Sequence, residues 1–320
     1  MAKSKRHLGR TDILITPIGL GTWQFSEGQG MNRFAWAAMT TETTNDIVKA
    51  ALDGGINWFD TAEIYGKGRS ERGLARGLKA AGISSGDVVI ATKWFPLFRR
   101  AASIKLTIDK RLRCLDPYSI DLHQVHLPYS FSSVGRQMNA MADLVEAGKI
   151  RAVGVSNFSA KMMCTAHAVL ARRGIPLASN QVRYNLVDRK IETNGVLDAA
   201  RELGISIICF SPLEFGLLTG KFHRDPGMLR SRPLMRRRVV GRLMQRGLPV
   251  VKLLEEIAAD RGVTAAQVAL NWLVNFNGEL VVAIPGASKP RHAEESAGAM
   301  DFELSTDEMA RLDKVSRQFR

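Results

Sequence analysis

Four side chains that can bind or release protons stand at or just beyond the ends of apolar, strand-like runs of the sequence. Asp60, Lys93 and His126 each close such a run, and Tyr65 follows Asp60 by five residues. A tyrosine has an ordinary pKa of about 10, so it exchanges protons poorly near neutrality. An ammonium beside it lowers that pKa, a carboxylate holds the ammonium in place, and a histidine can orient an incoming carbonyl oxygen. These residue types therefore suit protonation of the alkoxide that forms when a carbonyl is reduced.

Each of these residues also has an ordinary structural explanation. Asp60 could cap a turn, Lys93 could be a solvated strand end, and His126 could be a satisfied core histidine. Their joint occurrence on neighbouring strand ends favours a site, because a buried lysine and aspartate are tolerable only as a pair. No metal is expected, since His123 and His126 have no third partner at a ligand spacing.

The elements that must position these residues alternate along the chain. Apolar β-type runs are followed by amphipathic helical patterns, several of which end at a glycine suited to a left-handed helix C-cap. The expected strands cover residues 17–23, 56–60, 88–93, 120–126, 152–157, 178–184, 205–211 and 280–285. Eight such units without a break in composition predict an α/β fold, a (β/α)8 TIM barrel that spans residues 1–320 as a single domain. A doubly wound sheet is the alternative, but no G-x-G-x-x-G motif follows the first strand.

Three further segments complete this architecture. Residues 7–16 predict a short hairpin before the barrel, residues 213–248 predict a long loop after the seventh strand, and helices are expected at the C-terminus. An irregular loop of that length is usually functional or disordered. The C-terminal ends of barrel strands face the catalytic mouth, so the four residues above are expected on one rim.

Charge is the outlying property of the composition. The 320-residue chain has a formal net charge of +14, with 45% hydrophobic residues. Such an excess suits nucleic acid, an anionic membrane surface or an anionic cofactor. Much of it lies in residues 230–246, but no zinc pattern or aromatic single-strand-binding motif accompanies it, so nucleic-acid binding is not expected. A salt-sensitive contact of this segment with nucleic acid or membrane remains an alternative.

Several features concern the location of the protein. The longest apolar runs fall far short of the roughly 20 residues of a membrane-spanning helix, so no transmembrane segment is expected. The basic N-terminus is not followed by the apolar core of a signal peptide. Cys114, Cys164 and Cys209 form neither a disulfide framework nor a metal spacing. These features predict a cytoplasmic protein.

The four residues belong to a longer series of motifs that resembles the aldo-keto reductase family. The matching segments follow one another from residue 8 to residue 296: LGRTDILITPIGLGTW, GINWFDTAEIYGKGRSE, VIATKW, DLHQVHLP, GKIRAVGVSNF, NQVRYN, FSPLEFGLLTGKF and VVAIPGASKPRHAEES. Single motifs of this kind mean little, but the whole series in this order is specific. The chain is most similar to the longer-chain branch, which includes bacterial aldo/keto reductases and the potassium-channel β subunits.

The resemblance implies a (β/α)8 barrel that reduces an aldehyde or ketone by hydride transfer, with a catalytic tetrad of Asp60, Tyr65, Lys93 and His126. Tyr65 would be the general acid of reduction and the base of oxidation. Lys93, paired with Asp60, would lower its pKa, and His126 would orient the carbonyl. The implied cofactor is NADP(H), bound without a Rossmann motif. The implied cofactor-binding residues are Gly21, Thr22, Trp23, Ser156, Asn157, Gln181, Phe210, Ser211, Pro212, Leu213, Gly216, Leu218, Gly220, Lys221, Ile284, Gly286, Ser288, Lys289, His292, Glu295 and Ser296.

The resemblance also divides these residues by role. Ser156, Asn157 and Gln181 would hold the carboxamide, and Phe210 would stack on the nicotinamide ring. The glycine-bearing loop 211–221 would wrap the pyrophosphate.

The sequence departs from the family at several of these positions. Segment 284–296 would form the adenine and 2′-phosphate pocket at a helix N-terminus, but Ser288 stands where a basic residue is frequent and Ser296 where asparagine is usual. In the pyrophosphate loop, Glu214 and Phe215 replace residues that are more often small or basic.

Aromatic residues just beyond the strands suggest the substrate. Trp23, Phe25, Trp94 and Tyr129 are expected to wall an apolar pocket that tolerates aromatic compounds, although ordinary core or rim packing would also explain them. The arginines at 99–100 follow the third strand and could steer anionic carbonyl substrates, or could be solvated loop residues. A different class of function, a cofactor-binding regulatory subunit with little turnover, is the main alternative to a reductase.

Overall fold

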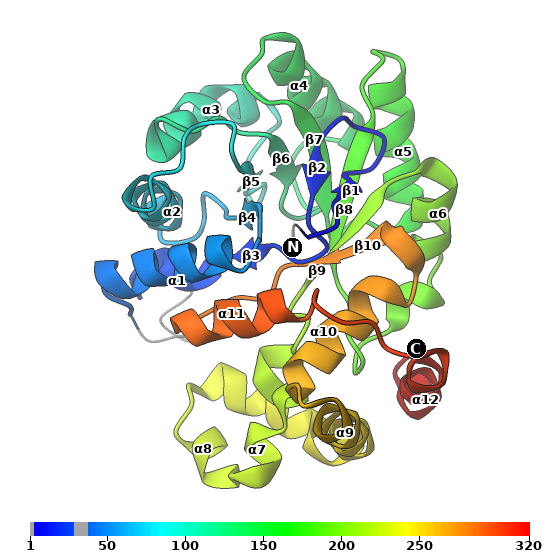
Figure 1. The fold of residues 1–320 in the computed structure, drawn as a ribbon. Coiled ribbons are helices and arrows are strands. Elements are labelled where there is room, and N and C mark those ends of the chain that lie inside the picture. The colour runs from blue at the N-terminus through cyan, green and yellow to red at the C-terminus, as the bar shows by residue number, and fades with distance from the viewer. Residues whose placement is uncertain (1–2, 29–37) are drawn as a thin grey trace.

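A curled parallel sheet forms the centre of the molecule (Figure 1). The computed structural model describes residues 3–28 and 38–320. Within them the sheet has eight strands: β3 (Leu20–Gly21), β4 (Trp58–Asp60), β5 (Val89–Trp94), β6 (Leu122–Val125), β7 (Ala152–Ser156), β8 (Leu177–Arg183), β9 (Ser206–Phe210) and β10 (Val281–Ala283). The backbone N–H of Gly19 donates to the Ala283 carbonyl at 2.8 Å, and that of Gly21 to the Pro285 carbonyl at 3.1 Å. These bonds join the first strand to the last, and the expected (β/α)8 barrel is confirmed.

Helices follow the strands along the chain and cover the outside of the sheet (Figure 1); α11 and α12 come after the last strand, β10. They include α1 (Thr41–Asp53), α2 (Arg69–Ala80), α3 (Ala102–Leu115), α4 (Val134–Glu146), α5 (Ala160–Ala171), α6 (Val196–Leu203), α10 (Ala265–Asn275), α11 (Pro290–Gly298) and α12 (Thr306–Ser316). Thr40, Ser133 and Ser159 precede three of them, and each hydroxyl accepts a hydrogen bond from the backbone N–H three residues on. Such caps satisfy a donor that the first helical turn leaves free. One face of each helix is apolar, as Met138 and Met141 show in α4.

The short hairpin expected before the barrel is present, and its side chains pack against one end of the barrel. Strands β1 (Arg6–His7) and β2 (Leu14–Ile15) pair antiparallel. Side chains of the hairpin and of the barrel strands share one buried apolar cluster: Leu8, Ile13, Ile15, Trp58, Ala91, Leu122, Ala152, Ala178, Ile208, Val282 and Ile284. Trp58 begins β4 and Asp60 ends it. The hairpin therefore closes the N-terminal end, and the C-terminal strand ends remain for a site.

Residues 213–248 are largely helical, so the expectation of a long irregular loop is wrong. They hold η4 (Glu214–Thr219), α7 (Lys221–Arg224), α8 (Pro226–Arg230) and the first half of α9 (Leu234–Arg261). Gly247 and Pro249 are residue types that disfavour the interior of a helix, yet both lie within α9. This helix buries Val240, Gly247 and Val250 and packs against η4 and α10. Tertiary packing of one face outweighs the weak local propensity here. Like the other helices that the structure describes, α9 is not apolar over a length that could cross a membrane.

The basic run 230–246 is partly used inside the protein. Arg236 is 5% exposed, and its guanidinium donates to the Phe215 carbonyl at 2.8 and 3.0 Å. Arg246 donates to the Gln318 carbonyl at 3.2 Å. Part of the positive charge of this run therefore serves intramolecular contacts.

Candidate active site

A buried ion pair between Lys93 and Asp60 lies at the open end of the barrel. The Lys93 ammonium donates to the Asp60 carboxylate and, at 2.8 Å, to the Thr61 carbonyl, and the two side chains are 0% and 2% exposed. The other Asp60 oxygen accepts hydrogen bonds from the amides of Gln124 at 3.0 Å and Gln181 at 2.9 Å. Burial lowers the pKa of Lys93, and Asp60 opposes that shift. The ammonium and both carboxylate oxygens have partners, which makes their burial tolerable.

Tyr65 and His126 lie next to this pair. The Lys93 ammonium is 5.2 Å from the centre of the Tyr65 ring, and the centres of the Tyr65 and His126 rings are 5.7 Å apart at an angle of 82°. Burial, and after it the Asp60 charge, raises the pKa of Tyr65. This net direction is opposite to the lowering expected from Lys93, and the phenol keeps its proton at neutral pH. Burial, and then Lys93, lowers the pKa of His126 well below its ordinary value, which leaves a neutral imidazole.

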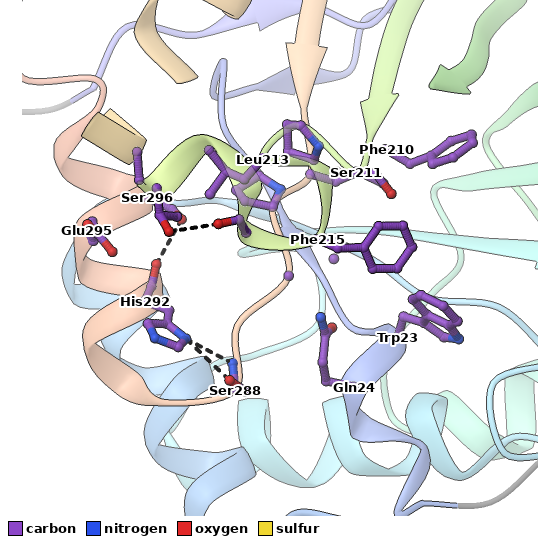
Figure 2. A pocket seen from close by; sticks show the side chains of 18 of the residues that line it. Trp23, Gln24, Phe210, Ser211, Leu213, Phe215, Ser288, His292, Glu295 and Ser296 are labelled. Atoms are coloured by element: carbon purple, nitrogen blue, oxygen red, sulfur yellow. Dashed lines mark hydrogen bonds between the residues drawn. The ribbon is translucent and has the colours of Figure 1, made fainter. Parts of the chain in front are cut away.

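A cavity of about 1090 Å³ opens beside Tyr65 and His126. Figure 2 shows the rings of Phe210, Phe215 and Trp23 on one side of it and helix α11 on the other. The predicted cofactor-binding residues in its wall are Gly21, Thr22, Trp23, Ser156, Asn157, Gln181, Phe210, Ser211, Pro212, Leu213, Gly216, Lys221, Ile284, Gly286, Ser288, His292, Glu295 and Ser296. The structure therefore brings most of the predicted set to one space whose wall also holds Asp60, Tyr65 and His126.

Three predicted cofactor-binding residues are not part of this wall. Leu218 is 0% exposed and packs in the core. Gly220 ends η4 with a φ of 75°, and a Cβ there would lie 2.1 Å from a carboxylate oxygen of Glu255. Lys289 directly precedes α11 as its N-cap. Leu218 and Gly220 thus shape the loop rather than face the cavity, and their role in cofactor binding stays a prediction.

Positive charge gathers in one part of the wall. Lys221, Arg236 and Arg291 all line the cavity. Burial, and then the Arg236 charge, lowers the pKa of Lys221 to about 8, and burial lowers the pKa of Arg236 to about 10. A Cβ at Gly286 would lie 2.3 Å from the Gln24 amide nitrogen, so glycine keeps the wall open there. Crowded cations and a glycine-lined cavity of this size fit the phosphate-bearing dinucleotide that the resemblance implies.

Amide and hydroxyl groups are fixed beside His126. The Ser156 hydroxyl donates to the Gln181 carbonyl at 2.9 Å. Asn157, with a φ of 61°, donates from its side-chain amide to the Ser156 hydroxyl at 2.9 Å and to the His126 carbonyl at 3.3 Å. These polar groups can recognise an amide in the cavity without moving.

The structure places only Trp23, of the four residues expected around the substrate, in the cavity wall. Phe25 and Trp94 are 2% and 1% exposed and pack in the core, whereas Tyr129 is 69% exposed outside the wall. Trp94 directly follows Lys93, and alternate residues of a strand face opposite sides of the sheet. The Trp94 indole therefore faces the helices around the barrel, and its N–H donates a hydrogen bond to the Ser103 hydroxyl of α3 at 3.0 Å. The expectation is corrected for these three residues.

Other residues supply the apolar wall near His126. Ile64, Phe95 and Leu127 line the cavity, and the Phe95 ring lies 5.8 Å from the His126 ring at an angle of 84°. They belong to the loops after β4, β5 and β6. Loop residues carry no periodic signal, so the sequence did not reveal which way they face.

Arg99 is engaged within the protein, contrary to the steering role considered for it. Its guanidinium donates to the Glu63 carboxylate, to the Phe95 carbonyl at 3.0 Å and to the Thr107 hydroxyl at 3.1 Å. Glu63 also accepts from the backbone N–H of Phe95 at 2.6 Å. Arg99 and Glu63 thereby fix the loop that carries Phe95. Arg100, the next residue, is exposed.

Several residues of the cavity wall were not predicted from the sequence, among them Gln24, Arg183 and Arg236. A usable signal existed for Arg183, because it follows Gln181 by two residues and alternate residues of a strand share a face. None existed for Arg236, which lies in α9 and reaches the site only through the packing of that helix.

A model of the Aldo/keto reductase family matches residues 17–317. An uncharacterized oxidoreductase of Mycobacterium tuberculosis is 39% identical over 312 residues, which cover 96% of this chain and 91% of the relative. The chloroplastic pyridoxal reductase of Arabidopsis thaliana is 32% identical over 321 residues, covering 96% of this chain and 84% of the relative. A crystal structure of an aldo-keto reductase from Klebsiella pneumoniae in complex with NADPH matches with a TM-score of 0.73 and 25% identity, covering 99% of this chain and 96% of that chain. This chain therefore belongs to the aldo/keto reductase family.

Proposed function

We propose that the protein reduces an aldehyde or ketone to an alcohol with NADPH, and that Tyr65 supplies the proton. The observation that carries the proposal is the position of Tyr65, beside His126 and the buried Lys93–Asp60 pair, in the wall of the large cavity. Membership of the aldo/keto reductase family supports an NADP-dependent oxidoreductase.

The cavity wall offers separate contacts for the two ends of the cofactor. Lys221, Arg236 and Arg291 would bind the phosphates, since cations crowded in a half-buried space are stabilised by anions. Asn157 and Gln181 would hold the carboxamide. When bound, NADPH supplies the hydride that reduces the carbonyl carbon.

Each of the four polar residues of the site has a separate role in transferring the proton. Tyr65 donates its phenolic proton to the carbonyl oxygen as negative charge develops there, and its raised pKa ensures that the proton is present at neutral pH. His126, kept neutral, can present one ring N–H to the same oxygen. The Lys93 ammonium, 5.2 Å from the phenol ring, stabilises the tyrosinate that remains, and Asp60 anchors the ammonium. One hydride and one proton convert the carbonyl to the alcohol, and solvent then reprotonates Tyr65.

The apolar wall indicates the class of substrate. Trp23, Ile64, Phe95 and Leu127 line the cavity together with His126. Apolar and aromatic side chains around a few polar groups favour carbonyl compounds with an apolar body, such as aromatic aldehydes.

Steady-state oxidation of NADPH with a panel of aromatic and aliphatic aldehydes tests the proposal. We expect turnover with several aromatic aldehydes and none without a carbonyl substrate. The assembled tetrad does not favour the regulatory-subunit alternative, because binding alone does not require a proton-transfer group. Tight binding of NADPH without turnover across the panel would contradict the reductase and support that alternative.

A further inference from the structure

A buried carboxylate holds the turn after β9 in a left-handed backbone conformation. Glu214 and Phe215 have φ angles of 43° and 53°, which residues with a Cβ rarely adopt. Glu214 is 0% exposed, and its carboxylate accepts hydrogen bonds from Arg183 at 3.1 Å and Asn185 at 2.9 Å. Asn185 also donates to the Ser211 carbonyl at 3.0 Å. The end of β8 therefore fixes the turn in place.

Arg183 contacts two aromatic rings at the same point. Its guanidinium carbon lies 5.7 Å from the centre of the Phe210 ring and 5.8 Å from that of Phe215. Both rings face the cavity, and the Phe215 ring lies 6.4 Å from that of Trp23 (Figure 2). A guanidinium near an aromatic ring gains a cation–π attraction, which is stronger where water is partly excluded. The Arg183 side chain is 35% exposed, so it forms part of the wall while it touches both rings.

The fold and the ion pair together set the orientation of this guanidinium. Arg183 and Phe210 are register partners in the adjacent strands β8 and β9, so their backbones are held side by side. Glu214 engages one Nη of the planar guanidinium. A planar group that is bonded at one edge and in contact with two rings has little rotational freedom left.

We propose that Arg183 is a positioning residue for the nicotinamide end of the cofactor: held by Glu214, it keeps the Phe210 ring in the orientation that stacks on the nicotinamide. The inference rests on the proposed function, because it takes Phe210 as the stacking surface. Lys221 and Arg291, in the phosphate-binding part of the wall, act on the other end of the cofactor. Loss of Arg183 should therefore weaken binding of the nicotinamide end only.

Two ligands separate the ends of the cofactor in a binding experiment. NADPH and adenosine 2′,5′-bisphosphate, which lacks the nicotinamide, are titrated by calorimetry into the unmodified protein, Arg183→Met and the matched control Arg291→Met. For Arg183→Met we expect NADPH to bind about fivefold more weakly or worse, and the bisphosphate to bind within about twofold of the unmodified protein. Arg291→Met should weaken both ligands to a similar extent. Glu214→Gln should show the Arg183→Met pattern in a milder form, because an amide oxygen still accepts a hydrogen bond from Arg183.

Each outcome decides the question. An unchanged affinity of Arg183→Met for NADPH overturns the proposal. An equal loss of affinity for both ligands also overturns the proposal, because it would show that Arg183 stabilises the whole turn rather than the nicotinamide end of the site. If Arg183→Met does not fold, Arg183→Lys replaces it: the charge remains without the planar fork, and a selective loss of NADPH affinity is again required. Failure of the unmodified protein to bind NADPH contradicts the proposed function instead, so the two failures are distinguishable.

Discussion

Lys93 and Asp60 form an ion pair inside the barrel, but the two partners are not equally supported by their surroundings. Asp60 accepts hydrogen bonds from the amides of Gln124 and Gln181 as well as from the ammonium. Lys93 has the Thr61 carbonyl as its second acceptor. The carboxylate is thus better satisfied without its partner than the ammonium is.

Removal of Asp60 should therefore destabilise the protein more than removal of Lys93. We expect Asp60→Ala to lower the free energy of unfolding by about 4 kcal/mol, because it leaves a buried ammonium without its counter-charge and removes an acceptor from the amides of Gln124 and Gln181. Lys93→Met should lower it by about 2 kcal/mol. Urea unfolding of the two variants measures the difference. Equal losses would show that the amides of Gln124 and Gln181 do not support Asp60.

The raised pKa of Tyr65 predicts different pH profiles for the two directions of reaction. Burial and the Asp60 charge keep the phenol protonated beyond its ordinary pKa. Reduction uses the protonated form, so kcat/KM for an aldehyde should stay flat from about pH 6 to 9. Oxidation uses the phenolate, so kcat/KM for the alcohol should rise over the same range, by up to about tenfold per pH unit. If kcat/KM for reduction fell as the pH rose through neutrality, a group other than Tyr65 would donate the proton.

Lys221 predicts a pH dependence of cofactor affinity. Burial and neighbouring cations lower the pKa of the free lysine to about 8. A bound phosphate raises that pKa, so binding takes up a proton above pH 8, whereas below pH 8 both states are already protonated. The affinity for NADPH should be constant between about pH 7 and 8, where its 2′-phosphate is fully ionised, and fall above pH 8. Lys221→Arg should abolish the fall because arginine keeps its charge. Calorimetric titrations across this pH range measure the dissociation constant of NADPH. A dissociation constant that does not change with pH would show that Lys221 does not contact a phosphate.

Arg99→Met should act on stability rather than on the salt dependence of turnover. Glu63 loses a charged donor, so we expect the free energy of unfolding to fall by about 1–2 kcal/mol. The ratio of kcat/KM for a carboxylated and an uncharged benzaldehyde, compared at about 0.1 and 1 M salt, should match that of the unmodified protein. Arg100→Ser, at the exposed neighbouring position, is the matched control for stability. A salt response lost in Arg99→Met but kept in Arg100→Ser would restore a steering role for Arg99.

The order of the elements and the residues at the strand ends could be predicted from the sequence, because an apolar run that stops at a polar residue marks both. Asp60 and Lys93 follow this rule. The orientation of loop residues could not be predicted in this way: Tyr129 is exposed outside the cavity wall, whereas Phe95 lines it. The helical state of α9 depends on packing against segments far away in the chain, which local patterns do not contain.

The pairing of Glu214 with Arg183 illustrates the same limit. The family motif alone marks Glu214 as unusual, but its partner lies 31 residues earlier, on the neighbouring strand. A residue that departs from a family pattern becomes interpretable once the fold shows its partner. Contacts of this kind arise from tertiary structure and have no signature in either segment.

The central claim is that Tyr65 donates the proton during reduction, and Tyr65→Phe tests it most directly. The substitution removes one hydroxyl and keeps the ring that packs against His126, so the fold and the affinity for NADPH should remain nearly unchanged. The deciding measurement is kcat for reduction of an aromatic aldehyde by NADPH in the unmodified protein and in Tyr65→Phe. We predict a loss of about 100-fold or more, as expected for removal of a general acid, whereas near-full turnover in the variant would contradict the account.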